Sequence, residues 1–399
     1  MNNQVRDYVL SSSHARIKEV RLISIAAAPR SNWSFLLLDT DDDRTGWGEL
    51  TLRSYERWLG LALEDLRPSL IGKSLAQVFS DFAARPSLPS GRVGNALLSA
   101  LDQAATDLVA QVKGQPIFEL LGCRHKRPLR GYATVNRSVR ERTPEGFAQA
   151  SLRAVEAGFR GVKIMPFDAL LPATASTPQG KHEIERALER IEAVREAVGS
   201  EIQLMVDCHW RLDEASAMTF INRAAQSNLH WVECPVPESE LWDAAIARLR
   251  QHANAHGILL AGAENGVCAS GYARFIQKGL YDVVMPDIKY CGGYGELGHI
   301  VGLARENGVS VSLHNPSGPV AHMHSLHACL ALGLDQPVEH QFSESPLFQS
   351  LINGVGPVTA NGCFEIGEAA GLGISVDTER AASHPLAYVP LSLADPSFA

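Results

Sequence analysis

The amino-acid sequence predicts an α/β protein built around a parallel (β/α)₈-type barrel, with a smaller α+β unit before it. Two observations lead to this prediction. From Arg130 onward, short apolar runs typical of strands alternate with helical patterns about eight times in roughly 210 residues, which fits a barrel better than an open sheet. Before that point, strand-like runs come first and helices follow, as in a separate α+β unit.

The N-terminal unit is expected to span residues 1–130. It opens with two strand-like runs, RIKEVRLISI and NWSFLLLD, and continues into Gly46-Trp47-Gly48-Glu49. Between Asn95 and Val112, apolar residues recur at helical spacing, and Gly114 and Pro116 end that helix. The order of elements therefore indicates a small sheet covered by a long helix.

The barrel is expected to span residues 131–353, and residues 354–399 are expected to return to the first unit. The long loop 166–180 is expected to lie over the active face, because loops after barrel strands do so. Each predicted strand is a short run rich in Val, Ile, Leu or Ala, and the eight are Gly131–Val135, Gly161–Met165, Ile202–Asp207, His230–Glu233, Leu259–Ala263, Val283–Pro286, Val309–Leu313 and Val338–His340.

Composition excludes several classes of protein. The 399 residues include 44 acidic and 36 basic side chains, a net charge of −8, which argues against nucleic-acid binding. No apolar run approaches the roughly 18–20 residues of a membrane span, and the N-terminus lacks the apolar core of a signal peptide. The seven cysteines form no CxxC pair. We therefore expect a cytoplasmic protein with reduced thiols and no membrane contact.

Three predicted strands end in a carboxylate, namely Asp207, Glu233 and Glu264. In a barrel the carboxyl ends of successive strands converge on one point. Three carboxylates cannot share a site without a cation, because each raises the pKa of the others. An all-oxygen ligand set suits Mg²⁺, so we predict a magnesium site. The competing interpretation is that each acid merely caps a helix.

The following strands supply groups for proton transfer. Asp287 and His314 end two of them, and an Asp bonded to a His sets up a general base. Lys163 lies on the second strand and Glu339 on the eighth. One cation, one His base, one Lys and one further acid suit removal of the proton beside a carboxylate, provided that the metal stabilises the enediolate.

These residues resemble those of the enolase superfamily, in its mandelate racemase subgroup. The resemblance covers nearly the whole chain: a capping domain with Gly46-Trp47-Gly48-Glu49 and the helix ALLSALDQAATDLVAQVKGQPIFELLG, then the barrel. It implies that the capping domain is completed by the C-terminal tail. It also implies a homo-oligomeric enzyme acting on a small carboxylate, with the three metal ligands, the Asp–His dyad and the substrate-binding acid of the eighth strand at the positions named above.

One departure from the subgroup concerns the second strand. The subgroup has Lys-x-Lys there, and its second lysine is a base, whereas this chain has Lys163-Ile164-Met165. Lys163 remains to hold the substrate carboxylate. His209, two residues after Asp207 and therefore expected on the same face of that strand, instead resembles the histidine that protonates the departing hydroxyl in acid-sugar dehydratases of the subgroup. We expect His314 to take the C2 proton, and His209 or His314 to help the C3 hydroxyl leave as water. We therefore predict a Mg²⁺-dependent hydro-lyase that yields a 2-keto-3-deoxy acid.

Two other roles stay open for His209. It could protonate C2, which would make the protein a racemase or epimerase of a hydroxy acid or an amino-acid derivative. It could also only bind a substrate hydroxyl. Further substrate contacts are expected from Asn136, Arg137 and Trp210 at strand ends, and from the loop 30–33 of the capping domain, which in the family helps to select the substrate.

Other motifs point to rival functions. One of them is a formal GxGxxG motif, Gly293-Tyr294-Gly295-Glu296-Leu297-Gly298. A dinucleotide site would need an acid about 20 residues later, where this chain has His314. A dinucleotide-binding oxidoreductase is therefore only a remote alternative, and no cofactor-binding residues are assigned. A zinc hydrolase would need His-x-His on the first strand, which has Thr134-Val135-Asn136-Arg137. A further alternative is a barrel that has lost catalysis and only binds its ligand. A histidine cluster is expected on a partly exposed helix face, and comprises His322, His324 and His327.

Overall fold

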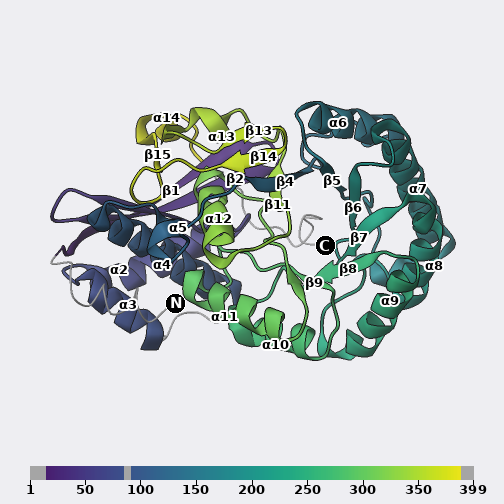
Figure 1. Ribbon diagram of the computed structural model, residues 1–399, viewed down its shortest axis with the longest axis horizontal. Helices are drawn as coiled ribbons and strands as arrows, with labels where there is room; N and C mark the ends of the chain where they lie inside the picture. Colours follow the sequence, from purple (N-terminus) through teal and green to yellow (C-terminus); the bar gives the residue numbers. More distant parts are fainter. Residues whose placement is uncertain (1–14, 85–90, 388–399) are drawn as a thin grey trace.

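Eight parallel strands curl into a barrel beside a smaller antiparallel sheet in the computed structural model, which describes residues 15–84 and 91–387 (Figure 1). All eight predicted barrel strands are confirmed. They are β4 (Leu129–Thr134), β5 (Gly161–Ile164), β6 (Gln203–Asp207), β7 (Leu229–Glu233), β8 (Leu259–Gly262), β9 (Val283–Val284), β10 (Ser310–Val311) and β11 (Val338–Gln341).

β11 closes the barrel by contacting β4 on one side and the residues that follow β10 on the other, and the two contacts are of different kinds. β11 pairs in parallel with β4, and the order then runs from β4 to β10. Within the described residues, β10 and β11 share no strand pairing. Ser312 Oγ instead donates to the carbonyl of Pro337 at 3.2 Å, and the backbone N–H of Asn315 donates to Glu339 Oε2 at 2.8 Å. Side chains therefore join the two strands that carry His314 and Glu339.

Helices surround the barrel because each buries one apolar face against the strands. Thr143 and Thr177 begin two of them by accepting the backbone N–H of Gly146 and Gly180, each at 3.1 Å. The helices are α6 (Pro144–Glu156), α7 (Pro178–Val198), α8 (Glu214–Ala224), α9 (Asp243–Ala255), α10 (Cys268–Gln277), α11 (Gly293–Glu306) and α12 (Pro319–Leu332), with short 3₁₀ turns at Pro172–Thr174, Ala225–Ser227 and Glu240–Trp242.

The N-terminal unit is an antiparallel sheet packed against the long helix α4 (Arg92–Lys113). Its strands are β1 (Ile17–Ala28), β2 (Ser31–Thr40) and β3 (Thr45–Glu49), and its other helices are α2 (Glu56–Leu70), α3 (Leu75–Ala84) and α5 (Ile117–Leu120). Two glycines let β3 approach α4 closely. A Cβ on Gly46 or Gly48 would lie 2.1 or 2.2 Å from a carbonyl oxygen of that helix.

The C-terminal segment contacts both units. β14 (Cys363–Glu365) pairs with β13 (Val358–Ala360) and with the start of β4, whereas β15 (Ile374–Val376) pairs with β12 (Ile352–Gly354). Near the helix α14 (Thr378–Ala382), the N–H of Ala26 in β1 donates to the carbonyl of His384 at 3.0 Å. The short helix α13 (Leu347–Ser350) precedes these strands. Within the described residues, the C-terminal tail therefore returns to the capping unit without adding a strand to its three-stranded sheet, and the domain boundaries stay a prediction.

Acidic residues of the capping unit hold the starts of two barrel helices. Glu49 accepts the backbone N–H groups of Gly318 and Ala321, each at 2.8 Å, at the N-terminus of α12. Asp102 of α4 accepts the N–H of Tyr294 at 2.7 Å, at the start of α11. A negative charge is favourable at a helix N-terminus. These contacts fix the loops after β9 and β10, which carry Asp287 and His314.

The prediction of a partly exposed histidine face on α12 was wrong. The helix was placed correctly, but His322, His324 and His327 are at most 1% exposed. Each ring has its own hydrogen-bond partners. His322 bonds to Asn315, and His324 bonds to the hydroxyl of Tyr294 and the carbonyl of Trp47. His327 bonds to the N–H of Phe118 and the carbonyl of Leu372. α12 lies between the barrel and the capping unit, so both of its faces are covered (Figure 1).

Among the described helices, none combines the length and the apolar composition that a bilayer span requires.

Candidate active site

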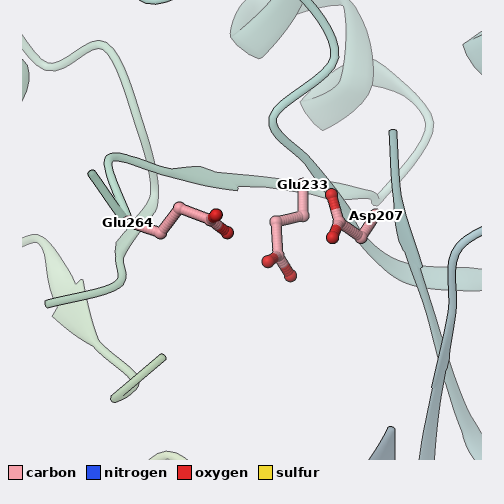
Figure 2. Close-up of side chains that lie close together, drawn as sticks. All are labelled: Asp207, Glu233 and Glu264. Atoms are coloured by element: carbon pink, nitrogen blue, oxygen red, sulfur yellow. The ribbon is translucent and has the colours of Figure 1, made fainter. Parts of the chain in front are cut away.

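Three carboxylates meet at the carboxyl ends of β6, β7 and β8. Asp207 and Glu233 are the last residues of their strands and lie side by side in register, and Glu264 follows β8 by two residues. Their side chains project into one space from neighbouring strands (Figure 2). One oxygen from each lies within 4.8 Å of the others, and all three residues are buried. The predicted convergence of these acids is confirmed.

The electrostatics of this triad favour a bound cation. Burial, and then the neighbouring carboxylates, raise the pKa of Asp207 to about 6 and that of Glu233 to about 7 despite the opposing effect of Lys163. The same causes raise the pKa of Glu264 well above its usual value. An all-oxygen set of this kind fits a hard divalent ion, whose charge would keep all three groups ionised.

The predicted Asp–His dyad is present beside the triad. Nδ1 of His314 lies 2.9 Å from Oδ2 of Asp287, and Nε2 lies 3.5 Å from Oε2 of Glu264. Asp287 is fully buried; burial acts to raise its pKa, but Lys289 and His314 hold the pKa below the usual value. An ionised Asp287 accepts the proton on Nδ1, so the other ring nitrogen of His314 is left as the basic one.

Two residues next to the dyad were missed in the sequence. Lys289 Nζ donates to Asp287 Oδ2 at 2.7 Å and to Ser317 Oγ at 2.6 Å. The hydroxyl of Tyr290 lies 3.2 Å from Nδ1 of His314. The sequence could have indicated them by position alone, because they follow Asp287 by two and three residues, in the loop after the strand end.

A cavity of about 530 Å³ opens above the dyad, between the barrel and the capping unit. Arg30 in the turn between β1 and β2 lines it, with Ser31 and Asn32 at the start of β2, and so does the long loop after β5 through Leu171 and Pro172. Both predicted segments contribute to the cavity, although residues 31–33 form part of a strand rather than a loop. Of the predicted site residues, six line the cavity: Arg137, His209, Trp210, Glu264, Asp287 and His314. Asn136 instead accepts a hydrogen bond from Arg142 at 2.8 Å.

Lys163 and Glu339 are buried, do not belong to the described lining of this cavity, and contact each other. Lys163 Nζ is 2.9 and 3.0 Å from the two oxygens of Glu233 and 3.0 Å from Glu339 Oε1. Burial acts to raise the pKa of Glu339, but Lys163, His314 and the N–H of Asn315 lower it to about 2. The second and eighth strands thus place an ion pair against the triad; the role of this pair in binding substrate stays a prediction.

His209 follows the end of β6 in a tight turn rather than within the strand. Its φ is 51°, and its backbone N–H donates to Asp207 Oδ1 at 2.8 Å. Burial first, and then the nearby guanidinium of Arg211, lower the pKa of its imidazole to about 4. His209 is therefore a neutral ring at the cavity wall, close to the triad.

The GxGxxG motif does not form a phosphate site. Gly293 begins α11, and the helix N-terminus is occupied by the carboxylate of Asp102, which accepts the N–H of Tyr294. A Cβ on Gly293 would lie 2.4 Å from that carboxylate. The glycine therefore allows the capping helix to approach, and the anion position that a dinucleotide would need is already filled.

Comparison with known families agrees with this geometry. The family described as enolase C-terminal domain-like matches residues 147–381, and the one described as the mandelate racemase/muconate lactonizing enzyme N-terminal domain matches residues 11–122. The chain belongs to the mandelate racemase/muconate lactonizing enzyme family of the enolase superfamily. The resemblance inferred from the strand-end acids and the dyad is confirmed.

Relatives within the enolase superfamily include dehydratases. The chain is 25% identical over 367 residues to a D-xylonate dehydratase of Haloferax volcanii. That alignment covers 88% of this chain and 85% of the dehydratase. It is 27% identical over 314 residues to a D-galactonate dehydratase of Verminephrobacter eiseniae, covering 78% of each.

Solved structures of the superfamily share the fold. A member from Salmonella Typhimurium has a TM-score of 0.82 at 22% identity, over 93% of this chain and 98% of that one. The 3,6-anhydro-D-galactonate cycloisomerase of Zobellia galactanivorans has a TM-score of 0.77 at 23% identity, over 92% and 99% of the two chains.

Proposed function

We propose that this protein is a Mg²⁺-dependent dehydratase of acid sugars, which removes the proton at C2 and the hydroxyl at C3 to give a 2-keto-3-deoxy acid. The observation that carries this proposal is the position of His314. One of its nitrogens is held by Asp287, and the other faces both the cavity and the acidic triad. The dehydratases among the relatives support the same reaction.

Asp207, Glu233 and Glu264 would hold the magnesium ion. When bound, Mg²⁺ offsets the negative charge that develops on a carboxylate as its α-proton leaves. Lys163, between Glu233 and Glu339, adds a fixed positive charge beneath the same place. We assign Lys163 and Glu339 to the end of the site that binds the substrate carboxylate, as the resemblance implies.

His314 is the proposed base for the C2 proton. Its Nε2 accepts the proton, and Asp287 stabilises the resulting imidazolium through the bond to Nδ1. The C2–H electrons form the new double bond to C3 as the C3–O bond breaks. The enol then becomes the 2-keto group, so one substrate yields one water and one keto acid.

The proton for the departing hydroxyl is assigned to His314 after it has taken the C2 proton. His209 is less suited, because a pKa of about 4 leaves it without a proton to give at neutral pH. We assign His209, Arg137 and Trp210 to contacts with substrate hydroxyls, since all three line the cavity.

Epimerisation is the weaker candidate for the same reason. It needs a second acid on the opposite face of C2, where the subgroup has a lysine and this chain has Met165. The neutral His209 does not replace that lysine, so the residues favour dehydration.

The proposal includes a cytoplasmic, homo-oligomeric enzyme. The cysteines support the first part, because no disulfide joins any of the seven, all of which lie in the described residues. The superfamily resemblance supports the second.

The test is an assay for 2-keto acid formation across a library of acid sugars, with Mg²⁺ and with EDTA. The proposal expects Mg²⁺-dependent keto acid from at least one sugar. Formation of a C2 epimer without keto acid would instead make the protein an epimerase, and turnover that survives EDTA would contradict the metal assignment.

A further inference from the structure

The cavity has an excess of arginine. Five arginines line it, and three of them come from the capping unit: Arg30 in the turn between β1 and β2, Arg53 after β3, and Arg92 at the start of α4. The barrel contributes Arg137 and Arg211. Of the described residues that line the same cavity, two are carboxylates, Glu264 of the triad and Asp287 of the dyad, and both are assigned other roles above.

Among the described residues, most of these arginines have no acidic partner. Arg137 pairs with Glu344. Arg92 donates to the neutral Asn265 at 2.8 Å, and Arg211 to the carbonyl of Leu170 at 2.9 Å. Four of the five arginines form no ion pair with a carboxylate in residues 15–84 and 91–387. They are Arg30, Arg53, Arg92 and Arg211. Arg211 still interacts electrostatically with the carboxylates of Asp207 and Asp168. Arg30, Arg53 and Arg92 are exposed, line the cavity and have no carboxylate partner among the described residues.

A monocarboxylic sugar acid does not account for this charge. Its single carboxylate is served by the triad end of the site, with Lys163 beneath, and its remaining groups are neutral hydroxyls. Arginine matches carboxylate and phosphate groups through two parallel hydrogen bonds, and in a partly closed site such bonds are stronger than those between neutral groups.

We infer that the substrate carries a second anionic group, at the end of the sugar chain remote from the reacting carboxylate, and that Arg30, Arg53 and Arg92 bind it. The preferred substrates are then dicarboxylic sugar acids or phosphorylated sugar acids, in contrast to the monocarboxylic D-xylonate and D-galactonate named for the relatives. The cavity volume of about 530 Å³ lies within the range of small-molecule sites. This inference rests on the proposed function.

The test compares substrates that differ only at the far end. Aldonates, the aldarates of the same configuration and the corresponding terminal phosphate esters are assayed for keto acid formation at fixed ionic strength. The expected result is a kcat/KM at least about tenfold higher for one dianionic series than for the matched aldonates. The series that wins identifies the second group as carboxylate or phosphate.

Variants assign the effect to the arginines. Arg30→Gln, Arg53→Gln and Arg92→Gln should each lower the ratio of kcat/KM for dianion over aldonate by about threefold to tenfold, and the triple variant should bring it near one. Arg67→Gln, an exposed position of α2 away from the cavity, is the matched control and should keep the wild-type ratio. Titration calorimetry with His314→Asn measures the same preference as a ratio of dissociation constants without turnover.

The outcomes separate the two proposals. Equal or better turnover of aldonates, with no change of the ratio in the triple variant, would overturn the second-anion inference and leave the dehydratase assignment intact. A lack of keto acid from every acid in all three series would overturn the dehydratase assignment itself.

Discussion

Nδ1 of His314 lies 2.9 Å from Oδ2 of Asp287, which makes Nε2 the nitrogen that faces the acidic triad. An ionised carboxylate can only accept, so the neutral ring carries its proton on Nδ1 and a lone pair on Nε2. The capping unit secures this arrangement from outside, because Glu49 and Asp102 hold the starts of the helices that follow the two strands.

Asp287→Asn should remove the base without removing the ring. The amide can donate to Nδ1, which favours the tautomer with the proton on Nε2, and that tautomer cannot take the C2 proton. We expect kcat to fall by about 10³- to 10⁴-fold, as for the equivalent change in a Ser-His-Asp triad. Steady-state kinetics check this, with the exposed Asp335→Asn as control. A loss of less than tenfold would mean that Asp287 does not set the tautomer.

Glu233→Gln should weaken metal binding. The substitution removes one ligand charge and leaves Lys163 paired with Glu339 alone. Since losing an outer contact of a metal ligand already costs about 10- to 100-fold in affinity, we expect the Mg²⁺ dissociation constant to rise by about 100-fold or more. Calorimetry measures it, and the exposed Glu240→Gln is the matched control. Unchanged affinity in Glu233→Gln would remove this residue from the ligand set.

Much of the site could be predicted because it follows from strand order. Asp207, Glu233 and Glu264 each come directly after an apolar run, and parallel strands bring such positions together. The sequence does not show which side chains from different strands pair with one another inside the barrel. It places Lys163 on the second strand, but not within 3.0 Å of both Glu233 and Glu339, so the degree to which the lysine is already neutralised could not be foreseen.

The histidines of α12 illustrate the same limit. Periodicity predicts a helix, but whether a helix face is covered depends on segments distant in the chain. His324 meets the carbonyl of Trp47, and His327 meets Phe118, both from the N-terminal unit. The prediction failed because the position of that unit against the barrel is set by packing of the whole fold rather than by any local pattern.

Gly48→Ala should destabilise the capping unit strongly. The added Cβ would lie 2.2 Å from the carbonyl oxygen of Ala100, so β3 or α4 would have to move. We expect a loss of about 1–3 kcal/mol or more in the free energy of unfolding, measured by urea denaturation. Gly60→Ala on α2 is the contrasting variant. Its nearest neighbour would be 3.9 Å away, and a helical Gly→Ala change should stabilise by up to about 1 kcal/mol. Equal effects of the two variants would contradict the packing argument.

Asp102 should make stability fall as the pH rises. Burial raises its pKa from 3.8 to about 6 in the folded protein, so the folded state binds the proton more tightly than the unfolded state between these values. Its contribution should decline by about 3 kcal/mol in total, mostly between pH 4 and pH 6, and stay constant above about pH 7.

Asp102→Asn keeps an oxygen for the N–H of Tyr294 but cannot ionise. The variant should therefore match the wild type near pH 4 and exceed its stability above pH 6, while the exposed Asp65→Asn should show no such difference. Urea denaturation at several pH values checks this. Parallel curves for wild type and Asp102→Asn would show that the pKa of Asp102 is the same in the folded and unfolded states.

His314 is the proposed base that takes the proton from C2 of an acid sugar. Proton NMR in D₂O, with Mg²⁺ and a substrate found in the library assay, follows the C2 proton directly in the wild type and in His314→Asn. We expect that the wild type removes the C2 proton and forms the 2-keto-3-deoxy acid, whereas His314→Asn, with Mg²⁺ affinity retained, leaves the C2 signal unchanged. Loss of the C2 signal at a wild-type rate in His314→Asn would contradict it.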